Sequence, residues 1–292
     1  MSTVVLFGAT GFLGRQVRAL LADDPRVSRL LCPGRTELDL LAATPDDAAR
    51  LLRAARPTVV LNCVGRLSGG YDELLRGNAT ATAVLVEAIV AAVPQARFVR
   101  LGSAAEYGPT EHGHSVHEQD PVRPAGAYGI SHLAGTLLVE RAALDGRLDG
   151  ASLRIFNPVG PGTSGESVLG RAGGALKRAV AARAAHIELG PLGAYRDFVD
   201  VRDVAGAVVR AAFVPELTER IFNVGSGRAV TVRQAVAMLA ARAGFGGEVR
   251  ESAPASARSA GVTWSRADTG RAARVLGWQP EYGLADSIKA MA

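Results

Sequence analysis

Two short motifs contain side chains that could reduce a carbonyl group. Ser103 follows an apolar run, and Tyr128 begins a segment of helical pattern in which His132 follows four residues later. Reduction of a ketone needs a proton donor at the carbonyl oxygen and a second hydrogen bond that holds this oxygen in place. Tyr128 can donate the proton, and Ser103 can supply the second bond. Because a phenol has an ordinary pKa of about 10, it needs a cationic neighbour, and residue 132 lies one helical turn away.

A glycine motif near the N-terminus gives this pair its context. Gly8, Gly11 and Gly14 follow the apolar residues 4–7 and precede an amphipathic segment over 15–21. The order predicts a strand, a tight turn and a helix, in which the glycines let the backbone approach a pyrophosphate and the helix pack on the strand. The free N–H groups and the helix dipole would favour phosphates. We therefore predict a dinucleotide site and not merely a flexible loop.

The end of the second predicted strand bears on the choice of cofactor. A carboxylate at this point favours NAD, whereas a basic side chain favours the additional phosphate of NADP. Here Cys32 is followed by Pro33, Gly34 and Arg35, with no carboxylate. A guanidinium group binds phosphate through a charge-assisted fork of hydrogen bonds. We therefore favour NADP(H) over NAD(H), the alternative being that Arg35 is only a solvated loop residue.

Short apolar runs alternate with longer helical patterns over the first two thirds of the chain. This alternation is typical of a parallel sheet covered by helices on both faces. The ligand is expected at the carboxyl ends of the strands. Strands are predicted at 3–7, 28–32, 58–62, 97–102, 151–156 and 220–224, helices at 13–22, 45–55, 79–92, 131–145, 167–184, 203–213 and 232–243, and a loop at 251–260.

Composition narrows the class of protein. The 292 residues are 48% hydrophobic, which argues against disorder. The formal charge of +5 is spread over predicted helices, so we expect an anionic small ligand and no nucleic acid. Cys32 and Cys63 lack the spacing of a disulfide framework or metal site and are predicted to be buried free thiols. With no apolar run of membrane-spanning length and no signal-peptide pattern, we expect no membrane partner and a cytoplasmic location.

Taken together, the motifs resemble the extended short-chain dehydrogenase/reductases that act on nucleotide sugars. The resemblance spans nearly the whole chain. Within that family it is most similar to reductases that convert a GDP-linked 4-keto-6-deoxyhexose to its alcohol. The segments that carry it are 8–14, Ser103 with 107–108, Tyr128 with position 132, 153–162, 196–203, 222–227 and 276–280.

The resemblance implies an α/β fold, a Rossmann-like doubly wound parallel sheet with a smaller C-terminal α/β substrate lobe, and commonly a homodimer. Residues 1–159 would form the dinucleotide-binding domain, joined by about 198–215, and residues 160–197 and 216–292 would form the lobe. The implied activity is NAD(P)H-dependent ketoreduction of a nucleotide sugar. The alternatives are a polyketide or other aglycone ketone of antibiotic biosynthesis, a nucleotide-sugar epimerase, and a non-catalytic nucleotide sensor.

The same resemblance assigns roles to individual residues. Ser103, Tyr128 and His132 would be catalytic, and Asp39 with Leu40 would meet the adenine. The expected cofactor-binding residues are Gly8, Thr10, Gly11, Phe12, Leu13, Gly14, Arg35, Asp39, Leu40, Cys63, Val64, Gly65, Asn78 and His132. The expected substrate-binding residues are Ser103, Ala104, His117, Tyr128, Asn157 and Arg196.

Position 132 departs from the family, which has lysine there. Histidine has an ordinary pKa of about 6.5 and is largely neutral at pH 7, so its help in acidifying Tyr128 would be partial. Reduction begins with a neutral tyrosine ready to donate its proton, whereas an epimerase must first deprotonate an alcohol. We therefore expect a reductase.

Other polar clusters are given structural interpretations. His112, His114 and His117 lie in a polar loop without a regular metal-binding pattern, so no metal is predicted, although His117 could contact substrate. Glu106 is expected only to cap or solvate a turn. Asp200 and Asp203 are interpreted as a salt-bridged turn at a helix start, and Trp264 and Trp278 as core residues of the lobe.

Overall fold

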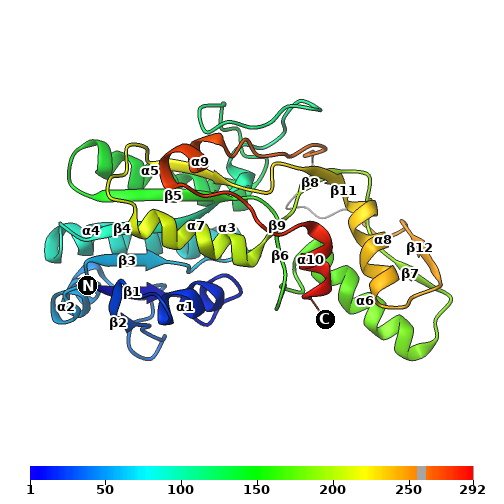
Figure 1. Cartoon of the computed structure of the whole chain (residues 1–292), viewed down its shortest axis with the longest axis horizontal. Coiled ribbons are helices and arrows are strands. Elements are labelled where there is room, and N and C mark those ends of the chain that lie inside the picture. The colour runs from blue at the N-terminus through cyan, green and yellow to red at the C-terminus, as the bar shows by residue number, and fades with distance from the viewer. Residues whose placement is uncertain (255–260, 292) are drawn as a thin grey trace.

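The computed structural model describes residues 1–254 and 261–291; the end of the loop expected at 251–260 lies outside them. Its larger part is a six-stranded sheet in the order β10–β5–β4–β3–β1–β2, with all neighbouring strands parallel (Figure 1). This arrangement confirms the predicted α/β class. The strands are β1 (Ser2–Phe7), β2 (Val27–Leu31), β3 (Val59–Asn62), β4 (Arg97–Ser103), β5 (Asp149–Ile155) and β10 (Ile221–Val224).

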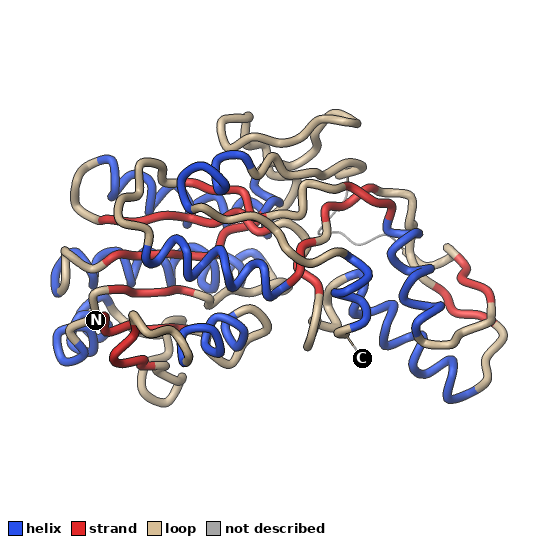
Figure 2. Tube along the Cα trace, in the orientation of Figure 1, coloured by secondary structure: helices blue, strands red, loops and turns tan. Residues whose placement is uncertain are grey.

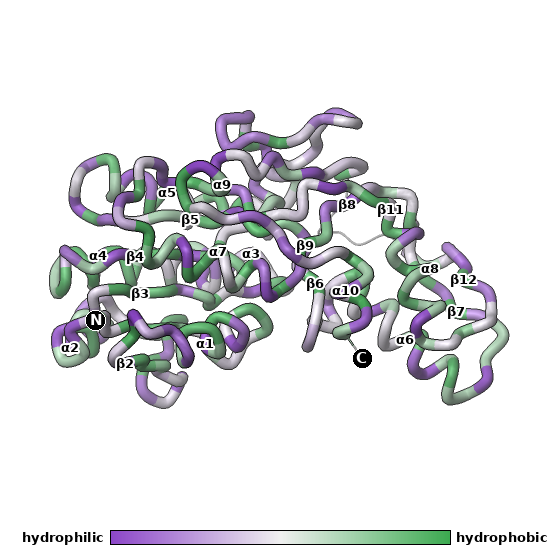
Figure 3. The backbone as a smooth tube through the Cα atoms, viewed as in Figure 1, coloured by the Kyte–Doolittle hydropathy of each residue, from purple (hydrophilic) through white to green (hydrophobic). Residues whose placement is uncertain are grey.

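Helices cover both faces of the sheet because side chains alternate between its faces along each strand. Val4 and Leu6 enter one core with α1, α7 and α9, whereas Val5 and Phe7 enter another with α2, α4 and α5. Figure 2 shows helices on both sides of the strands. Burial on both faces explains why β1 and β3 are largely apolar runs, and Figure 3 shows the hydrophobic colouring along β3. The helices are α1 (Gly14–Ala22), α2 (Pro45–Ala55), α4 (Ala81–Ala92), α5 (Ala127–Leu144), α7 (Val201–Phe213) and α9 (Gly270–Leu276).

The glycine motif forms the predicted turn between β1 and α1. Gly8 has a φ of +76°, and a Cβ atom there would lie 2.7 Å from the carbonyl carbon of Cys63. A Cβ atom on Gly14 would lie 2.0 Å from Gly8 O. The first contact lets β1 and β3 end side by side, and the second lets α1 begin directly against the turn. Both positions therefore require glycine.

The helix expected at 79–92 begins eight residues earlier. α3 (Tyr71–Leu75), a π-helical turn (Arg76–Thr80) and α4 form one continuous helix. Asp72 and Glu73 lie in its first turn, where the helix dipole favours negative charge. By length and composition this helix could cross a membrane, but 61% of its apolar window is buried within the protein, as in a core helix.

The C-terminal lobe lies beside the carboxyl ends of the strands (Figure 1). Its core forms where α8 (Val232–Arg242) packs against α6 (Val168–Ala182) and α10 (Leu284–Lys289). The paired strands are short, and β6 with β9 joins the lobe to the sheet domain. These pairs are β7 (His186–Glu188) with β12 (Glu248–Arg250), β8 (Tyr195–Asp197) with β11 (Ala229–Thr231), and β6 (Pro158–Val159) with β9 (Val199–Asp200).

The boundary expected at residue 216 is corrected by the structure. β10 is an edge strand of the large sheet, and α9 packs into the core that α7 shares with that sheet. Trp278 belongs to the same core and not to the lobe, and its indole N–H donates to Asp203 O at 3.0 Å. The chain therefore returns to the larger domain within 216–292, because β10 pairs in parallel with the edge strand β5 and α9 packs against α7.

Gly14→Ala is expected to destabilise the protein by roughly 2 kcal/mol or more, since its Cβ atom would overlap the carbonyl of Gly8. Urea unfolding followed by circular dichroism measures this change. Gly246→Ala is the matched control, because a Cβ atom there meets no atom within 4 Å and the change should stay within about 0.5 kcal/mol. Equal stability of the two variants would contradict the packing argument.

Candidate active site

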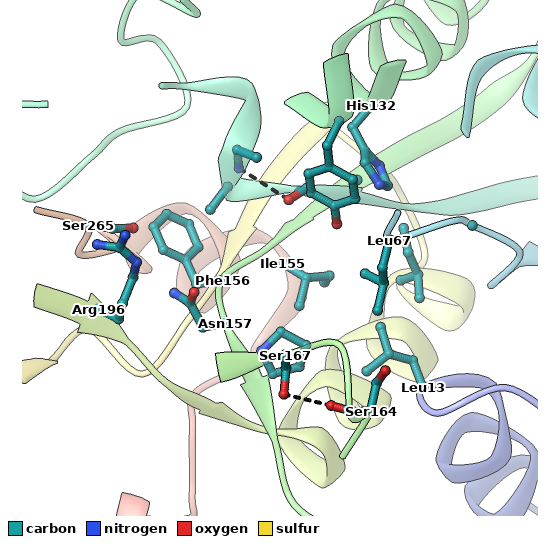
Figure 4. Close-up of a pocket in the computed structure, with 18 of the residues that line it drawn as sticks. Leu13, Leu67, His132, Ile155, Phe156, Asn157, Ser164, Ser167, Arg196 and Ser265 are labelled. Atoms are coloured by element: carbon teal, nitrogen blue, oxygen red, sulfur yellow. Dashed lines mark hydrogen bonds between the residues drawn. The ribbon is translucent and has the colours of Figure 1, made fainter. Parts of the chain in front are cut away.

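A cavity of about 350 Å³ lies at the carboxyl ends of the central strands. The glycine turn, the ends of β3, β4 and β5, and segments of the lobe line it (Figure 4). Open α/β sheets bind their ligands at this position. The lining residues that Figure 4 labels are Leu13, Leu67, His132, Ile155, Phe156, Asn157, Ser164, Ser167, Arg196 and Ser265.

Ser103, Tyr128 and His132, the three residues expected to be catalytic, all line this cavity. Ser103 ends β4, and its hydroxyl accepts a hydrogen bond from Ala105 N at 3.2 Å, which orients it. Tyr128 and His132 lie one turn apart on α5, and their rings meet edge-on with centroids 4.6 Å apart. Residues 25 positions or more apart in the chain are thereby brought to one site.

The imidazole of His132 is neutral at pH 7. Its side chain is almost fully buried, and Nη2 of Arg100 lies 3.4 Å from its Nδ1. Burial, and next the positive charge of Arg100, hold the pKa of His132 well below its ordinary value. The neutral state expected from the sequence is therefore reinforced by the environment, and His132 carries no charge that could stabilise a phenolate on Tyr128.

A buried carboxylate connects the elements that carry these side chains. Glu106 accepts hydrogen bonds from Ser103 N at 3.0 Å and from the hydroxyl of Thr136, on α5, at 2.9 Å. Its other oxygen pairs with Nε of Arg154, on β5, at 2.8 Å. Arg154 also donates to the hydroxyl of Tyr107 at 2.9 Å. Glu106 is thus a central support of the site, a role that the sequence analysis missed.

The turn before α1 fits a dinucleotide. Gly11, Phe12 and Leu13 line the cavity together with residues 63–65 at the end of β3. No side chain caps the N-terminus of α1. The N–H groups of Arg15 and Gln16 already donate to Gly11 O at 3.0 Å and to Leu13 O at 3.1 Å, so an anion would meet the backbone of the turn that precedes them. The close approaches at Gly8 and Gly14 leave backbone where a side chain would otherwise stand. Residues 8–14 would therefore hold the pyrophosphate, and residues 63–65 lie between it and His132.

Four further residues are expected to bind the cofactor. Thr10 and Arg35 are exposed, in the glycine turn and in the loop after β2. The carboxylate of Asp39 accepts a hydrogen bond from Leu41 N at 3.1 Å, and Leu40 is buried in the core beside α2. The structure thus leaves Arg35 accessible to a ligand, while Leu40 contributes mainly to packing.

Asn78 supports the site from behind the cavity lining. It is buried in the π-helical turn, where its amide donates to Arg66 O and to the Ser131 hydroxyl, both at 3.0 Å, and accepts from Arg66 N at 2.8 Å. A Cβ atom on Gly65 would lie 3.2 Å from this amide oxygen and 4.0 Å from Cε1 of His132. Asn78 therefore fixes the loop that lies beside His132, as π-helical turns often do at functional sites.

Besides Ser103 and Tyr128, three more of the expected substrate-binding residues line the cavity: Ala104, Asn157 and Arg196. Asn157 donates to Asp197 O at 2.9 Å. Arg196 donates to the carbonyls of Tyr195 and Val262, both at 2.8 Å, and burial lowers the pKa of its guanidinium. These bonds hold the two side chains at the edge where the lobe meets the sheet domain.

His117 and Trp264 lie in the loops around the cavity. His117 is exposed and lies 3.3 Å from a carboxylate oxygen of Asp268, outside the cavity lining, and its contact with substrate stays a prediction. Trp264 is buried, as expected, but it lines the cavity and packs at a tilt against His112, with ring centroids 4.4 Å apart, instead of joining the core between α6 and α8. In both cases the position depends on long-range packing of the lobe onto the histidine loop, through contacts such as Trp264 Nε1 to His114 O at 2.6 Å.

The remaining polar clusters have structural roles. Asp200 caps α7 and pairs with Arg202 at 2.7 Å, and Asp203 lies in the first turn, as the sequence indicates. Burial raises the pKa of Cys63 to about 12 and also raises that of Cys32, so both thiols are neutral at pH 7. Among residues 1–254 and 261–291, no group of three or more His, Cys, Asp or Glu side chains could hold a metal ion.

Comparison with known proteins identifies the family. Residues 4–225 match the model of the NAD dependent epimerase/dehydratase family. The chain belongs to this family. A dTDP-6-deoxy-L-talose 4-dehydrogenase (NAD(P)(+)) of Kitasatospora kifunensis is 36% identical over 98% of this chain and 93% of its own. A GDP-6-deoxy-D-mannose reductase of Pseudomonas aeruginosa is 28% identical, covering 97% and 94%.

Solved structures agree with this membership. The structure of RMD from Pseudomonas aeruginosa complexed with NADPH has a TM-score of 0.86 and 25% identity, covering 99% of this chain and 97% of its own. MoeE5 in complex with UDP-glucuronic acid and NAD has a TM-score of 0.83 and 28% identity, with the same coverage. The resemblance inferred from the motifs is thereby confirmed, and the protein is an NAD(P)-dependent enzyme of the extended short-chain dehydrogenase/reductase class.

Arg154→Met is expected to destabilise the protein by about 3–5 kcal/mol, because it leaves the buried charge of Glu106 without its partner. Urea unfolding measures the loss. The double variant Glu106→Gln with Arg154→Met removes both charges and should recover part of it. If the double variant were as unstable as Arg154→Met alone, the ion pair would not be the support described here.

Proposed function

We propose that the protein is an NAD(P)H-dependent ketoreductase that acts on a 4-keto-6-deoxyhexose linked to a nucleoside diphosphate. The observation that carries this proposal is one cavity lined by the glycine turn, by the Tyr128 and Ser103 hydroxyls, and by a neutral His132. A neutral partner at position 132 suits a reaction that starts from protonated tyrosine. An epimerase begins instead by removing a proton from an alcohol and starts from the phenolate, which a neutral His132 does not itself stabilise.

The side chains provide the acid half of the reaction. Tyr128 donates its phenolic proton to the carbonyl oxygen of the substrate and is left as phenolate, while the Ser103 hydroxyl donates a hydrogen bond to the same oxygen. The reduced dinucleotide, when bound, supplies hydride to the carbonyl carbon. Ser103 can hold this orientation because Glu106 accepts its backbone N–H and Ala105 N donates to its hydroxyl.

A nucleotide sugar suits the lobe side of the site. A second cavity, beside the first, is lined by Arg171, Arg178 and Arg196, and the two cavities share Arg171 and Arg196. Guanidinium groups bind diphosphates well, and their positive charge attracts an anionic substrate. Both curated relatives named above act on 6-deoxyhexoses linked to nucleoside diphosphates, dTDP in one and GDP in the other. These observations support a nucleotide sugar over an aglycone ketone.

NADP(H) is the proposed preference among the two cofactors. The exposed Arg35, in the loop after β2, can reach a ribose phosphate. Residues 32–35 contain no carboxylate, and the carboxylate of Glu37 is engaged by Gly34 N at 2.9 Å. The fold relative from Pseudomonas aeruginosa is complexed with NADPH, while the Kitasatospora relative is described as using NAD(P)(+).

We expect the reaction to take place in the cytoplasm.

A homodimer is also proposed. Apolar side chains on the outer faces of the neighbouring helices α3 and α5 remain exposed to solvent. Exposed apolar patches of this kind mark protein interfaces. The exposed residues are Tyr71 and Leu75 on α3, and Ile130, Leu137, Leu138 and Leu144 on α5.

Tyr128→Phe is expected to lower kcat for the 4-keto sugar by about 100-fold or more, because the proton donor is lost. The oxidation of NADPH, followed by absorbance with dTDP- and GDP-linked substrates, measures this loss. Tyr71→Phe is the control, since Tyr71 is 77% exposed and is not among the residues that line the cavity, and it should keep the parent rate. Equal rates of Tyr128→Phe and the parent would overturn the proton route.

A further inference from the structure

A buried arginine lies directly behind His132. Arg100, on β4, is 1% exposed. Its Nη1 donates to Thr136 Oγ1 at 2.8 Å and to His132 O at 3.2 Å, and its Nη2 lies 3.4 Å from Asn78 O and from Nδ1 of the His132 ring. The guanidinium thus contacts both the backbone and the ring of the residue that replaces the family's lysine.

We propose that Arg100 is a positioning residue: it fixes the tautomer of His132 and provides, from behind the ring, the positive charge that His132 itself does not carry. The part that concerns Tyr128 rests on the proposed function. The part that concerns the tautomer is a property of the resting protein and is independent of the substrate.

The tautomer follows from the hydrogen-bonding groups available. A guanidinium group has only N–H donors, so Nδ1 of His132 must be the acceptor and the ring proton lies on Nε2. His132 lines the cavity, and Gly65 lies beside its Cε1. The Nε2–H edge is therefore directed toward the loop of residues 63–65, which lines the cavity beside the glycine turn. The ring is therefore prepared to donate one hydrogen bond there at any pH at which it is neutral.

The charge follows from how the buried groups are paired. Besides Tyr128, the groups whose charges act on Arg100 are Glu106 and Arg154, which form an ion pair with each other at 2.8 Å. Burial lowers the pKa of Arg100 to about 10, so this third group is still cationic at pH 7. The set of three carries a net positive charge, which favours the phenolate of Tyr128 as the proton leaves.

The tautomer can be read directly from the protein without any ligand. Protein labelled with ¹⁵N-histidine should show the Nε2–H form of His132 by long-range ¹⁵N–¹H correlation from pH 5.5 to 8.5, and the His132→Gln variant assigns the signals. In Arg100→Gln, which keeps a donor but loses the charge, the ring should take up a proton at a higher pH than in the parent. An Nδ1–H tautomer, or a parent ring that titrates at about pH 6.5, would overturn the proposal.

The charge can be read from the pH profile of reduction. Loss of the positive charge raises the pKa of Tyr128, so the alkaline limb of kcat/KM should move up by about one pH unit in Arg100→Gln and return toward the parent in Arg100→Lys. An unmoved limb in folded Arg100→Gln contradicts the charge role. If Arg100→Gln does not fold, the parent's tautomer measurement still decides the proposal.

The two experiments separate this inference from the proposed function. A protein with the Nε2–H tautomer that reduces no nucleotide-linked ketone would overturn the function and leave the positioning role intact. An active reductase whose His132 carries the Nδ1–H tautomer would overturn the positioning role and leave the proposed function intact.

Discussion

The active site depends on ionised side chains that are buried between the sheet and helix α5. Glu106 and Arg154 form an ion pair whose side chains are almost completely buried, and Arg100 is buried beside them. Buried charges are costly unless they are paired and hydrogen-bonded, so each must keep its partners. Because the partners of Glu106 include Ser103 N and the hydroxyl of Thr136, β4 and α5 cannot move apart without exposing an unpaired charge.

The same constraint sets the spacing along α5. Tyr128, His132 and Thr136 recur every four residues and therefore lie on one face of the helix, so anchoring Thr136 at the sheet directs the other two toward the cavity. Close approach is possible because residue 135 is glycine, whose Cβ atom would lie 2.6 Å from Asn78 O and 2.8 Å from Nη2 of Arg100. Local helical geometry and long-range charge pairing thus determine the site together.

Features that are local in the sequence could be predicted, and features that arise from pairing across the chain could not. The glycine turn, the central strands and the Ser103–Tyr128 pair follow from spacing and apolar runs. Glu106 meets Arg154 across 48 residues, and no local pattern indicates this. Arg100 within a strand looks like an ordinary interruption of an apolar run, and only its burial reveals its role. From the sequence alone, β10 is assigned to the lobe and Trp264 is not predicted to line the cavity, in both cases because the neighbours come from distant segments.

The account as a whole requires that this cavity reduce a ketone at C4 of a nucleotide-linked sugar. The most direct measurement is mass spectrometry and NMR of the sugar product after incubation of dTDP- or GDP-linked 4-keto-6-deoxyhexose with the protein and NADPH. The account predicts a product that is richer by two hydrogen atoms and bears a hydroxyl group at C4. An isomer of unchanged mass, or substrate recovered intact from both nucleotides, would contradict it.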